Sequence, residues 1–251
     1  MNKQRVVHAA LTAVALAAAV PLAGAATTWT SSDCTASGSG SGNSYICGSG
    51  TDAMTAQAWS TTGSGGTYRT ATLTRWDGGF GVNNGGSSEG SSPQHALDNQ
   101  NNTDLIGLSF AQRVTLSSLK LGWVHNDSDL SVLAYTGASA PSSLTGFSAA
   151  TLLGAGSGWS LVGNYANVGT NTKTINTGDT SSSWWLVSAY NSNFGSGTGL
   201  GGGNDYVKLL SVAGTPEEPP GVPEPGTLAL AGVALLGAWR LRRKGKASPT
   251  A

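Results

Sequence analysis

The residues that could do chemistry lie in two short acidic stretches of the chain. "HALDNQNNTD" holds Asp98 and Asp104, and "VHNDSD" holds Asp127 and Asp129. Carboxylate oxygens are the hard ligands that calcium takes in proteins. The four acids therefore predict a calcium site, provided that the fold brings the two stretches together at one end of the molecule.

A repeated pattern accompanies these acids. "TDLIGLSF" (103–110) and "SDLSVLAY" (128–135) share D-L-x-x-L-x-aromatic, and "NDYVKLL" (204–210) is a looser third copy. Each copy places an aspartate directly before an expected strand. The simpler interpretation is turn chemistry, because Asp and Asn bond to nearby backbone where turns begin. The alternative is an ion or sugar site built where strand ends meet.

The chain offers few combinations of side chains that could act in catalysis. After residue 25 the only histidines are His95 and His125. His95, Asp98 and a serine would make a triad, but no G-x-S-x-G nucleophile elbow occurs on an α/β pattern. Both histidines with Asp127 would make a zinc site, and no pair of acids is singled out as glycosidase carboxylates. We expect a non-enzymatic protein without a cofactor, calcium excepted.

Cys34 and Cys47 are the only two cysteines of the chain. In an exported protein such a pair predicts a disulfide, with two free thiols as the alternative. The bridge would close the Gly/Ser-rich stretch "TASGSGSGNSYI". In the chain-entropy model, a disulfide that closes a loop of this length stabilises the folded protein by about 3 kcal/mol.

Tryptophans offer a second kind of binding chemistry. Indole rings give flat apolar surfaces for sugar rings when they are exposed, although aromatic residues in strands more often belong to a core. An exposed aromatic cluster beside the acidic loops would favour carbohydrate binding. The candidates are Trp76, Trp123, Trp159, Trp184 and Trp185.

The sequence patterns predict that the elements carrying these residues are β-strands. "TYRTATLTRW" (67–76) is rich in threonine and aromatic residues, and "GWSLVGNY" (158–165) alternates, with Trp159, Leu161 and Tyr165 on one side. "SWWLVSAY" (183–190) is apolar on both faces, as in a central strand. In "RVTLSSLKLGW" (113–123) the period-2 pattern slips by one residue, which predicts a bulge or tight turn near Ser117 and Ser118. The class indicated is all-β, an antiparallel β-sandwich, of which the jelly roll is one form.

The amino-terminal end has the features of a secretory signal peptide. Lys3 and Arg5 form a basic start, an apolar run follows from Val6 to Leu22, and Ala23-Gly24-Ala25 is an A-x-A cleavage motif. Signal peptidase would cut between Ala25 and Ala26. The chain is therefore expected to be exported.

The carboxyl-terminal end carries a second apolar run. The thirteen residues from Thr227 to Trp239 include no charge. As a helix they would span about 20 Å, which is short for a bilayer core of about 30 Å. The run suits a segment that is recognised in a membrane, with an ordinary single-span anchor as the alternative. The basic residues that follow would stay in the cytoplasm: Arg240, Arg242, Arg243, Lys244 and Lys246.

Together, Val222-Pro223-Glu224-Pro225, the apolar run and Arg240, Arg242, Arg243 and Lys244 resemble the PEP-CTERM sorting signal of Gram-negative bacteria. The stretch from "TDLIGLSF" to "NDYVKLL" also looks like one family of exosortase-dependent surface proteins. The resemblance implies processing by exosortase, a membrane-embedded cysteine transpeptidase, at Pro223-Glu224-Pro225. It also implies passage through the inner membrane to the surface or matrix of a bacterium that makes exopolysaccharide.

The charge between the two terminal signals is acidic. Residues 26–221 hold six basic and twelve acidic side chains, a net charge of −6. Without a basic patch, nucleic-acid binding is not expected. We therefore expect a cell-surface or matrix protein, with a carbohydrate-binding module in an exopolysaccharide matrix as the alternative. The expected organisation is signal peptide 1–25, Gly/Ser-rich segment 26–66, β-sandwich 67–213, proline-rich linker 214–221 and sorting signal 222–246, with its helix at 227–239 and basic tail at 240–246.

Overall fold

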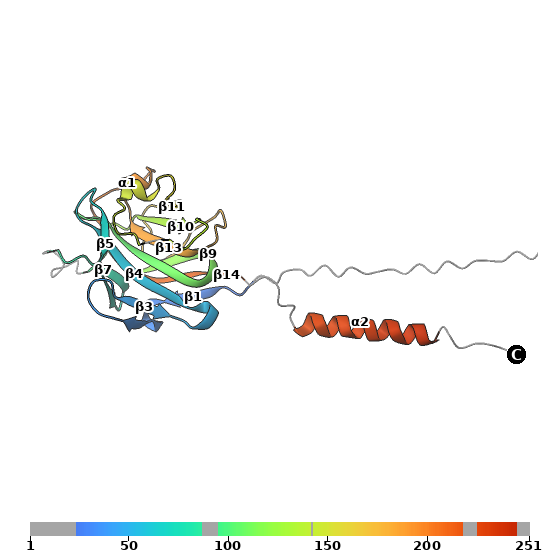
Figure 1. Cartoon of the computed structure of the whole chain (residues 1–251). Coiled ribbons are helices and arrows are strands. Elements are labelled where there is room, and N and C mark those ends of the chain that lie inside the picture. The colour runs from blue at the N-terminus through green and yellow to red at the C-terminus, as the bar shows by residue number, and fades with distance from the viewer. Residues whose placement is uncertain (1–23, 87–94, 142, 218–224, 245–251) are drawn as a thin grey trace, which may run out of the picture.

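A computed structural model describes residues 24–86, 95–141, 143–217 and 225–244, with the side chains of the last segment described from 230 to 239. The predicted signal peptide therefore lies almost entirely outside the described residues. Figure 1 shows a curled β-sheet and a separate carboxyl-terminal helix. The strands are β1 (Thr27–Thr30), β2 (Thr35–Ser37), β3 (Ser44–Cys47), β4 (Met54–Thr61), β5 (Tyr68–Thr70), β6 (Thr72–Trp76), β7 (Gly79–Asn83), β8 (Leu97–Asp98), β9 (Asp104–Asn126), β10 (Leu130–Tyr135), β11 (Trp159–Tyr165), β12 (Thr172–Thr174), β13 (Ser182–Ala189) and β14 (Asp205–Pro216).

The sheet is organised around β9, a strand of 23 residues. The main order is β11-β10-β13-β9-β14-β7-β6, and the strand pairings are antiparallel. The first part of β9 pairs with β4 and β13, and its second part pairs with β12 and β14. The antiparallel β class is confirmed. The predicted sandwich is not confirmed: β9 passes from one set of neighbours to the other, and hydrogen bonds join the described strands into one curled sheet.

Two hydrophobic clusters lie on opposite faces of this sheet, because side chains alternate along each strand. The larger includes Leu116, Leu121, Val132 and Trp185. The smaller contains Leu105, Leu133, Trp159, Leu186 and Phe194, together with residues of the one-turn helix α1 (Ala149–Leu152) and the loop before it. Loops and α1 cover part of the second face and leave its margin open.

The predicted bulge in β9 is confirmed. Ser118 pairs with Ala213 while Leu116 pairs with Gly214, so Ser117 is the extra residue. Ser117 is exposed, whereas Leu116 and Leu119 are both buried. The bulge returns the apolar residues on both sides of it to the same core.

The other strand predictions have mixed outcomes. β13 lies between β9 and β10, as expected of a strand that is apolar on both faces. β11 does not keep the predicted alternation: a register shift opposite Val132 and Leu133 leaves Leu161 37% exposed. "TYRTATLTRW" forms two strands, β5 and β6, instead of one.

The segment before residue 67 is part of the same sheet. β1 pairs with β14, with Thr27 opposite Gly214, and β4 pairs with the first part of β9. The sheet therefore crosses the predicted boundary between residues 66 and 67. Short 3-10 helices follow β1 and β3, namely η1 (Ser31–Asp33) and η2 (Gly50–Asp52); a third, η3 (Ser192–Phe194), follows β13.

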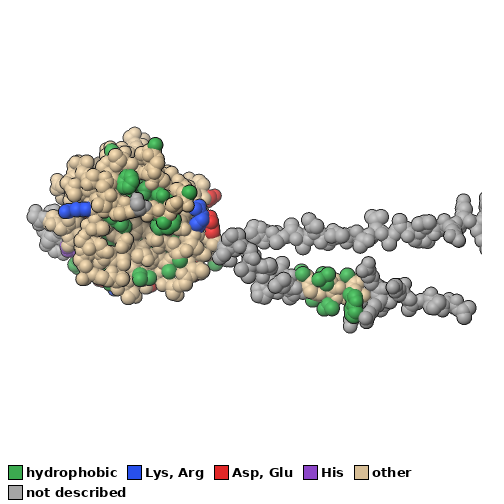
Figure 2. Space-filling model, viewed as in Figure 1, with side chains coloured by type: hydrophobic (Ala, Val, Ile, Leu, Met, Phe, Trp, Pro, Cys, Tyr) green, Lys and Arg blue, Asp and Glu red, His purple; other side chains and the backbone are tan. Residues whose placement is uncertain are grey.

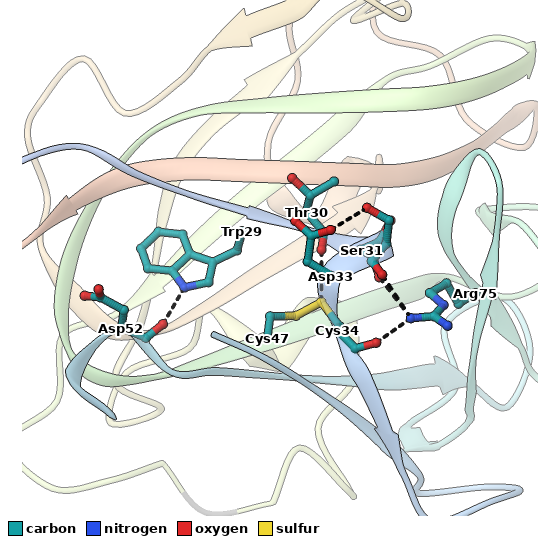
Figure 3. Close-up of a disulfide and its surroundings, with 9 residues drawn as sticks. Trp29, Thr30, Ser31, Asp33, Cys34, Cys47, Asp52 and Arg75 are labelled. Atoms are coloured by element: carbon teal, nitrogen blue, oxygen red, sulfur yellow. Dashed lines mark hydrogen bonds between the residues drawn. A yellow bond between two sulfur atoms is a disulfide. The ribbon is translucent and has the colours of Figure 1, made fainter. Parts of the chain in front are cut away.

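The structure contains the disulfide between Cys34 and Cys47 (Figure 3). The two cysteines close the β2–β3 hairpin at its open end, since Thr35 pairs with Ile46. Both are buried. Close by, the Trp29 indole N–H donates to the Asp52 carbonyl at 2.6 Å, and the Arg75 guanidinium donates to the Cys34 carbonyl.

The apolar run at the carboxyl terminus forms the helix α2 (Pro225–Lys244), which is longer than the predicted 227–239. Proline is tolerated at its first position, because that residue needs no N–H there. Its described side chains are largely exposed, including Leu230, Val233, Leu235 and Leu236. Within the described part of the chain, no helix has the length and hydropathy that crossing a membrane requires.

Candidate functional site

Three carboxylates meet where β9, β10 and β14 come together. One oxygen from each of Asp127, Asp129 and Asp205 lies within 4.8 Å of the others. Asp127 and Asp129 precede β10, and Asp205 begins β14. Asp129 and Asp205 are fully buried, so the cluster is largely beneath the surface.

Backbone amides hold these carboxylates in place. The two oxygens of Asp129 accept from the N–H groups of Asn167 and Gly201, each at 2.7 Å. Asp205 accepts from the N–H of Asp129 at 2.6 Å and from the amide of Asn99 at 2.5 Å. The cluster thus ties together loops that lie far apart in sequence, which gives it a structural role whether or not a cation binds.

The pKa of Asp205 is raised from 3.8 to about 7, mainly by burial. The charges of Asp129 and Asp127 contribute to this rise, while the hydrogen bonds from the Asp129 N–H and the Asn99 amide oppose it. Asp205 is therefore close to half-protonated near neutral pH.

The predicted calcium ligands are only partly brought together. Asp127 and Asp129 belong to the cluster, and Asp98 and Asp104 do not. Asp98 lies in β8, opposite Tyr206, and Asp104 begins β9. The third acid, Asp205, was missed as a ligand, although its place in the third copy of the repeated pattern could have indicated it. Calcium binding itself stays a prediction.

Near the cluster, a row of rings crosses the outer surface of the sheet. The rings of Trp76 and His95 are stacked at 5.8 Å, those of Trp123 and His125 at 6.0 Å, and the Lys208 ammonium lies over both indoles. Burial and the Lys208 charge lower the pKa of His95. Among the described residues, neither histidine joins the carboxylate cluster, so the considered zinc set is not assembled.

A second group of rings borders a pocket of about 240 Å³ on the margin of the smaller hydrophobic cluster. Its lining includes Trp59 from β4, Trp159 from β11 and Trp184 from β13, together with Thr55, Gln57, Gly107 and Ser109. We call this the tryptophan pocket. Trp59 and Trp184 are half-buried, and no lining residue is charged.

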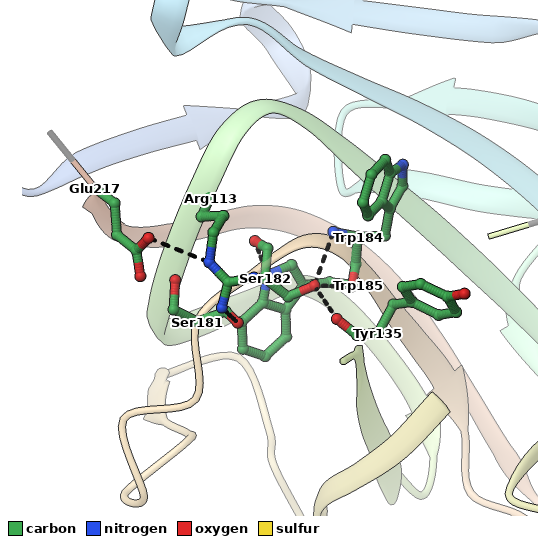
Figure 4. A network of polar contacts seen from close by, with 7 residues as sticks. All are labelled: Arg113, Tyr135, Ser181, Ser182, Trp184, Trp185 and Glu217. Atoms are coloured by element: carbon green, nitrogen blue, oxygen red, sulfur yellow. Dashed lines mark hydrogen bonds and ion pairs between the residues drawn. The ribbon is translucent and has the colours of Figure 1, made fainter. Parts of the chain in front are cut away.

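Trp184 and Trp185 are consecutive residues of β13, so their indoles lie on opposite faces of the strand (Figure 4). Just before them the pairing with β9 shifts: Trp184 pairs with Ser109 but Ser182 pairs with Val114, which leaves three extra residues on β9. The buried Ser182 hydroxyl lies 2.7 Å from the Tyr135 carbonyl and accepts from the Trp184 N–H at 3.0 Å. Trp184 faces the pocket, whereas Trp185 is fully buried in the larger core.

Two further contacts shape the pocket. Gly107 has no side chain, and a Cβ there would lie 2.7 Å from a ring carbon of Trp59, so the glycine allows this indole to lie against β9. Tyr135 contacts Trp159 and Trp184 edge-on, at 5.2 and 6.0 Å between ring centroids. The rings are thus positioned by strands and by each other.

The sorting-signal residues are described only in part. Val222, Pro223 and Glu224 lie outside the described residues, whereas Ala25 and Ala26 of the predicted signal-peptidase site lie within them, and cleavage there stays a prediction. Pro225 begins α2, and Arg240, Arg242, Arg243 and Lys244 fall in its last turns. Just before this region, Arg113 pairs with Glu217 at 3.1 Å and ties the end of β14 to β9 (Figure 4).

Comparison with protein families finds a match to the PEP-CTERM protein-sorting motif over residues 221–244. Comparison with curated proteins finds no match. Comparison with solved structures finds none.

Proposed function

We propose that this chain, which carries a PEP-CTERM protein-sorting motif, is a non-enzymatic protein of the cell surface or extracellular matrix that exosortase processes. The motif itself indicates export and exosortase processing. The observation that carries the proposal is the order of the parts: a β-sheet that ends at Pro216, the motif from residue 221, and an apolar helix with a basic end.

The exposed helix supports this reading. Leu230 is 75% exposed and Leu235 is 72% exposed, and α2 stands apart from the sheet in Figure 1. Large apolar side chains in this arrangement are not buried by the protein's own core. They fit a segment whose partner is a membrane and, within it, the processing enzyme. The proposed route is therefore export, a transient stay in the inner membrane of a Gram-negative bacterium, and release to the surface.

The β-sheet region has features that support an extracellular location. Figure 2 shows few charged side chains on the visible face, and the chain has only 10% charged residues. The buried disulfide fits an oxidising compartment. β1 begins at Thr27, directly after the predicted cleavage site, so removal of residues 1–25 by signal peptidase would leave the sheet intact.

Removal of the tail can be tested by mass spectrometry of protein extracted from the cell surface. We expect the mature protein to lack the peptide that ends at Ala251. A Glu224→Gln variant should stay in the membrane fraction with its tail, because it alters the motif. Glu217→Gln, an equal change outside the motif, is the control and should be processed normally. Recovery of Ala251 on the surface form of the unaltered protein would refute processing and restore the permanent anchor.

The alternative function, a carbohydrate-binding module acting in an exopolysaccharide matrix, is favoured by one observation. Two groups of tryptophans reach the surface, and one of them borders a pocket with uncharged polar side chains. Such a module would also be a matrix protein, so this function adds to the first. Its test is direct binding of sugars to the purified protein.

A further inference from the structure

We infer that the tryptophan pocket binds one ring of a neutral saccharide, held between the Trp59 and Trp184 indoles and hydrogen-bonded by Gln57, Thr55 and Ser109. This inference rests on the alternative function above and names its site and ligand class. It does not depend on the sorting signal.

The polar side chains of the pocket are available to a ligand. Thr55, Gln57 and Ser109 make no side-chain hydrogen bond to another described residue, although each lies on a strand within the sheet. The Trp59 indole N–H is buried and has no acceptor in the described part of the chain. A buried donor without a partner costs free energy, and a ring hydroxyl oxygen would supply the acceptor.

The register of the strands arranges these groups on two sides of a hollow. Ser109 lies between Thr55 on β4 and Trp184 on β13, and Gly107 lies between Gln57 and Leu186 in the next row. Because Gly107 has no side chain, the Trp59 indole can lie over it and form one wall of the pocket. The polar side chains of the pocket lie mainly on β4, and the apolar side chains of Trp184 and Leu186 lie on β13.

This distribution matches a sugar ring better than other ligands. A pyranose has an apolar face of C–H groups and a rim of hydroxyls, so it needs an aromatic wall beside donors and acceptors. The pocket contains no charged residue, and a charged ligand would lose its hydration without gaining an ion pair. Its volume of about 240 Å³ is below the usual range for drug-sized ligands, roughly 300–1,000 Å³, which favours a single ring.

The other surfaces fit a sugar ring less well. In the row of stacked rings near the carboxylate cluster, the Lys208 ammonium already lies over the indoles of Trp76 and Trp123. A sugar that stacked there would have to displace this cation. A larger hollow of about 630 Å³ beside Asn99 and Asn191 is lined mostly by asparagine, serine and glycine. It offers hydrogen bonds but lacks an indole wall.

The test uses the full chain in a detergent without a sugar head group, which would otherwise compete. Ligand-observed NMR would follow methyl glycosides of glucose, galactose and mannose, N-acetylglucosamine and, as the charged comparison, glucuronate. A ligand of about 12 non-hydrogen atoms with ordinary efficiency should bind with a Kd on the order of 1 mM. We expect saturable binding of at least one neutral sugar and weaker binding of glucuronate.

Variants locate the site. Trp184→Ala should weaken binding by about tenfold, because it removes one aromatic wall. Gln57→Ala should weaken it several-fold, and this change removes a side chain that makes no hydrogen bond to another residue that the structure describes, so the fold is kept. Trp76→Ala is the matched control, since Trp76 is 44% exposed on the other aromatic surface, and should leave binding unchanged.

Three results would overturn the inference: no saturable binding of any neutral sugar, unchanged binding in both pocket variants, or an equal loss in the Trp76 variant. Glucuronate binding more tightly than the neutral sugars would overturn the assigned ligand class. None of these results affects the fate of the tail, so a failure of this inference is distinguishable from a failure of exosortase sorting.

Discussion

The buried Asp205 carboxyl should make the stability of the protein depend on pH. Its pKa is about 7 in the folded protein, above the value of 3.8 that it has in an unfolded chain. The folded state therefore binds the proton more tightly. The free energy of unfolding receives its full contribution from this group below pH 4, loses it as the pH rises towards 7, and levels off above that.

The magnitude follows from the pKa difference. About three pKa units at 1.36 kcal/mol each give roughly 4 kcal/mol as the upper limit. Relaxation around the buried charge reduces this, and about 2 kcal/mol is expected at the effective dielectric that buried sites usually show.

Urea unfolding of the full chain, followed by tryptophan fluorescence in the presence of a chelator, measures this effect. Asp205→Asn removes the titration while keeping the side chain's shape. Any hydrogen-bonding cost of the amide is the same at every pH, so it does not affect how the difference in unfolding free energy changes with pH. We expect the variant to be less stable than the original chain near pH 4.5, and the difference to shrink by about 2 kcal/mol towards pH 8.

Asp179→Asn is the control, because Asp179 is an exposed aspartate in a turn away from the cluster. Its stability relative to the original chain should not vary over the same pH range. A difference between the Asp205 variant and the original chain that stays constant with pH, or widens towards pH 8, would refute the reasoning.

The remaining predictions concern calcium, the disulfide and the start of β13. Calcium at about 5–10 mM should raise the melting temperature by a few degrees above pH 7 but not near pH 5, because protonated Asp205 is a poor ligand; an unchanged melting curve would end the calcium hypothesis. Replacing Cys34 and Cys47 by alanine should cost about 3 kcal/mol, or roughly 6–12 °C in Tm, and stoichiometric thiol labelling of the unreduced protein would contradict the bond. Ser182→Ala should cost about 1–3 kcal/mol by calorimetry, because a partly buried N–H and carbonyl lose their partner. A loss below about 0.5 kcal/mol would mean that the hydroxyl does not hold the start of β13 in place.

Features that depend on neighbouring residues could be predicted from the sequence. The bulge at Ser117 follows from a slip in a period-2 pattern, and that slip is visible within eleven letters. The disulfide follows from there being only two cysteines in an exported chain. The central position of β13 follows from apolar residues on both of its faces. In each case the physical cause is local.

Features that depend on strand register could not be predicted. Asp205 joins Asp129 through a hydrogen bond that spans 76 residues of sequence, and only the pairing of β14 with β9 brings it there. Trp59 was not a binding candidate, because its place over Gly107 requires the pairing of β4 with β9. Trp184 and Trp185 look alike in sequence, and the register of β13 on β9 decides which one reaches the pocket.

The pairing of β1 with β14 sets the order of events during export. These are the first and the last strands of the sheet, and Thr27 lies opposite Gly214. A chain that enters an export channel by its amino terminus delivers β14 last, and until then the second half of β9 lacks its main neighbour. The sheet therefore cannot close before residue 216 has crossed, when the apolar helix is the next segment to arrive. On the proposed route, the membrane would capture the tail at nearly the same time as the sheet folds. A chain cut short before β14 would reach the outside with open strand edges and be a target for proteases.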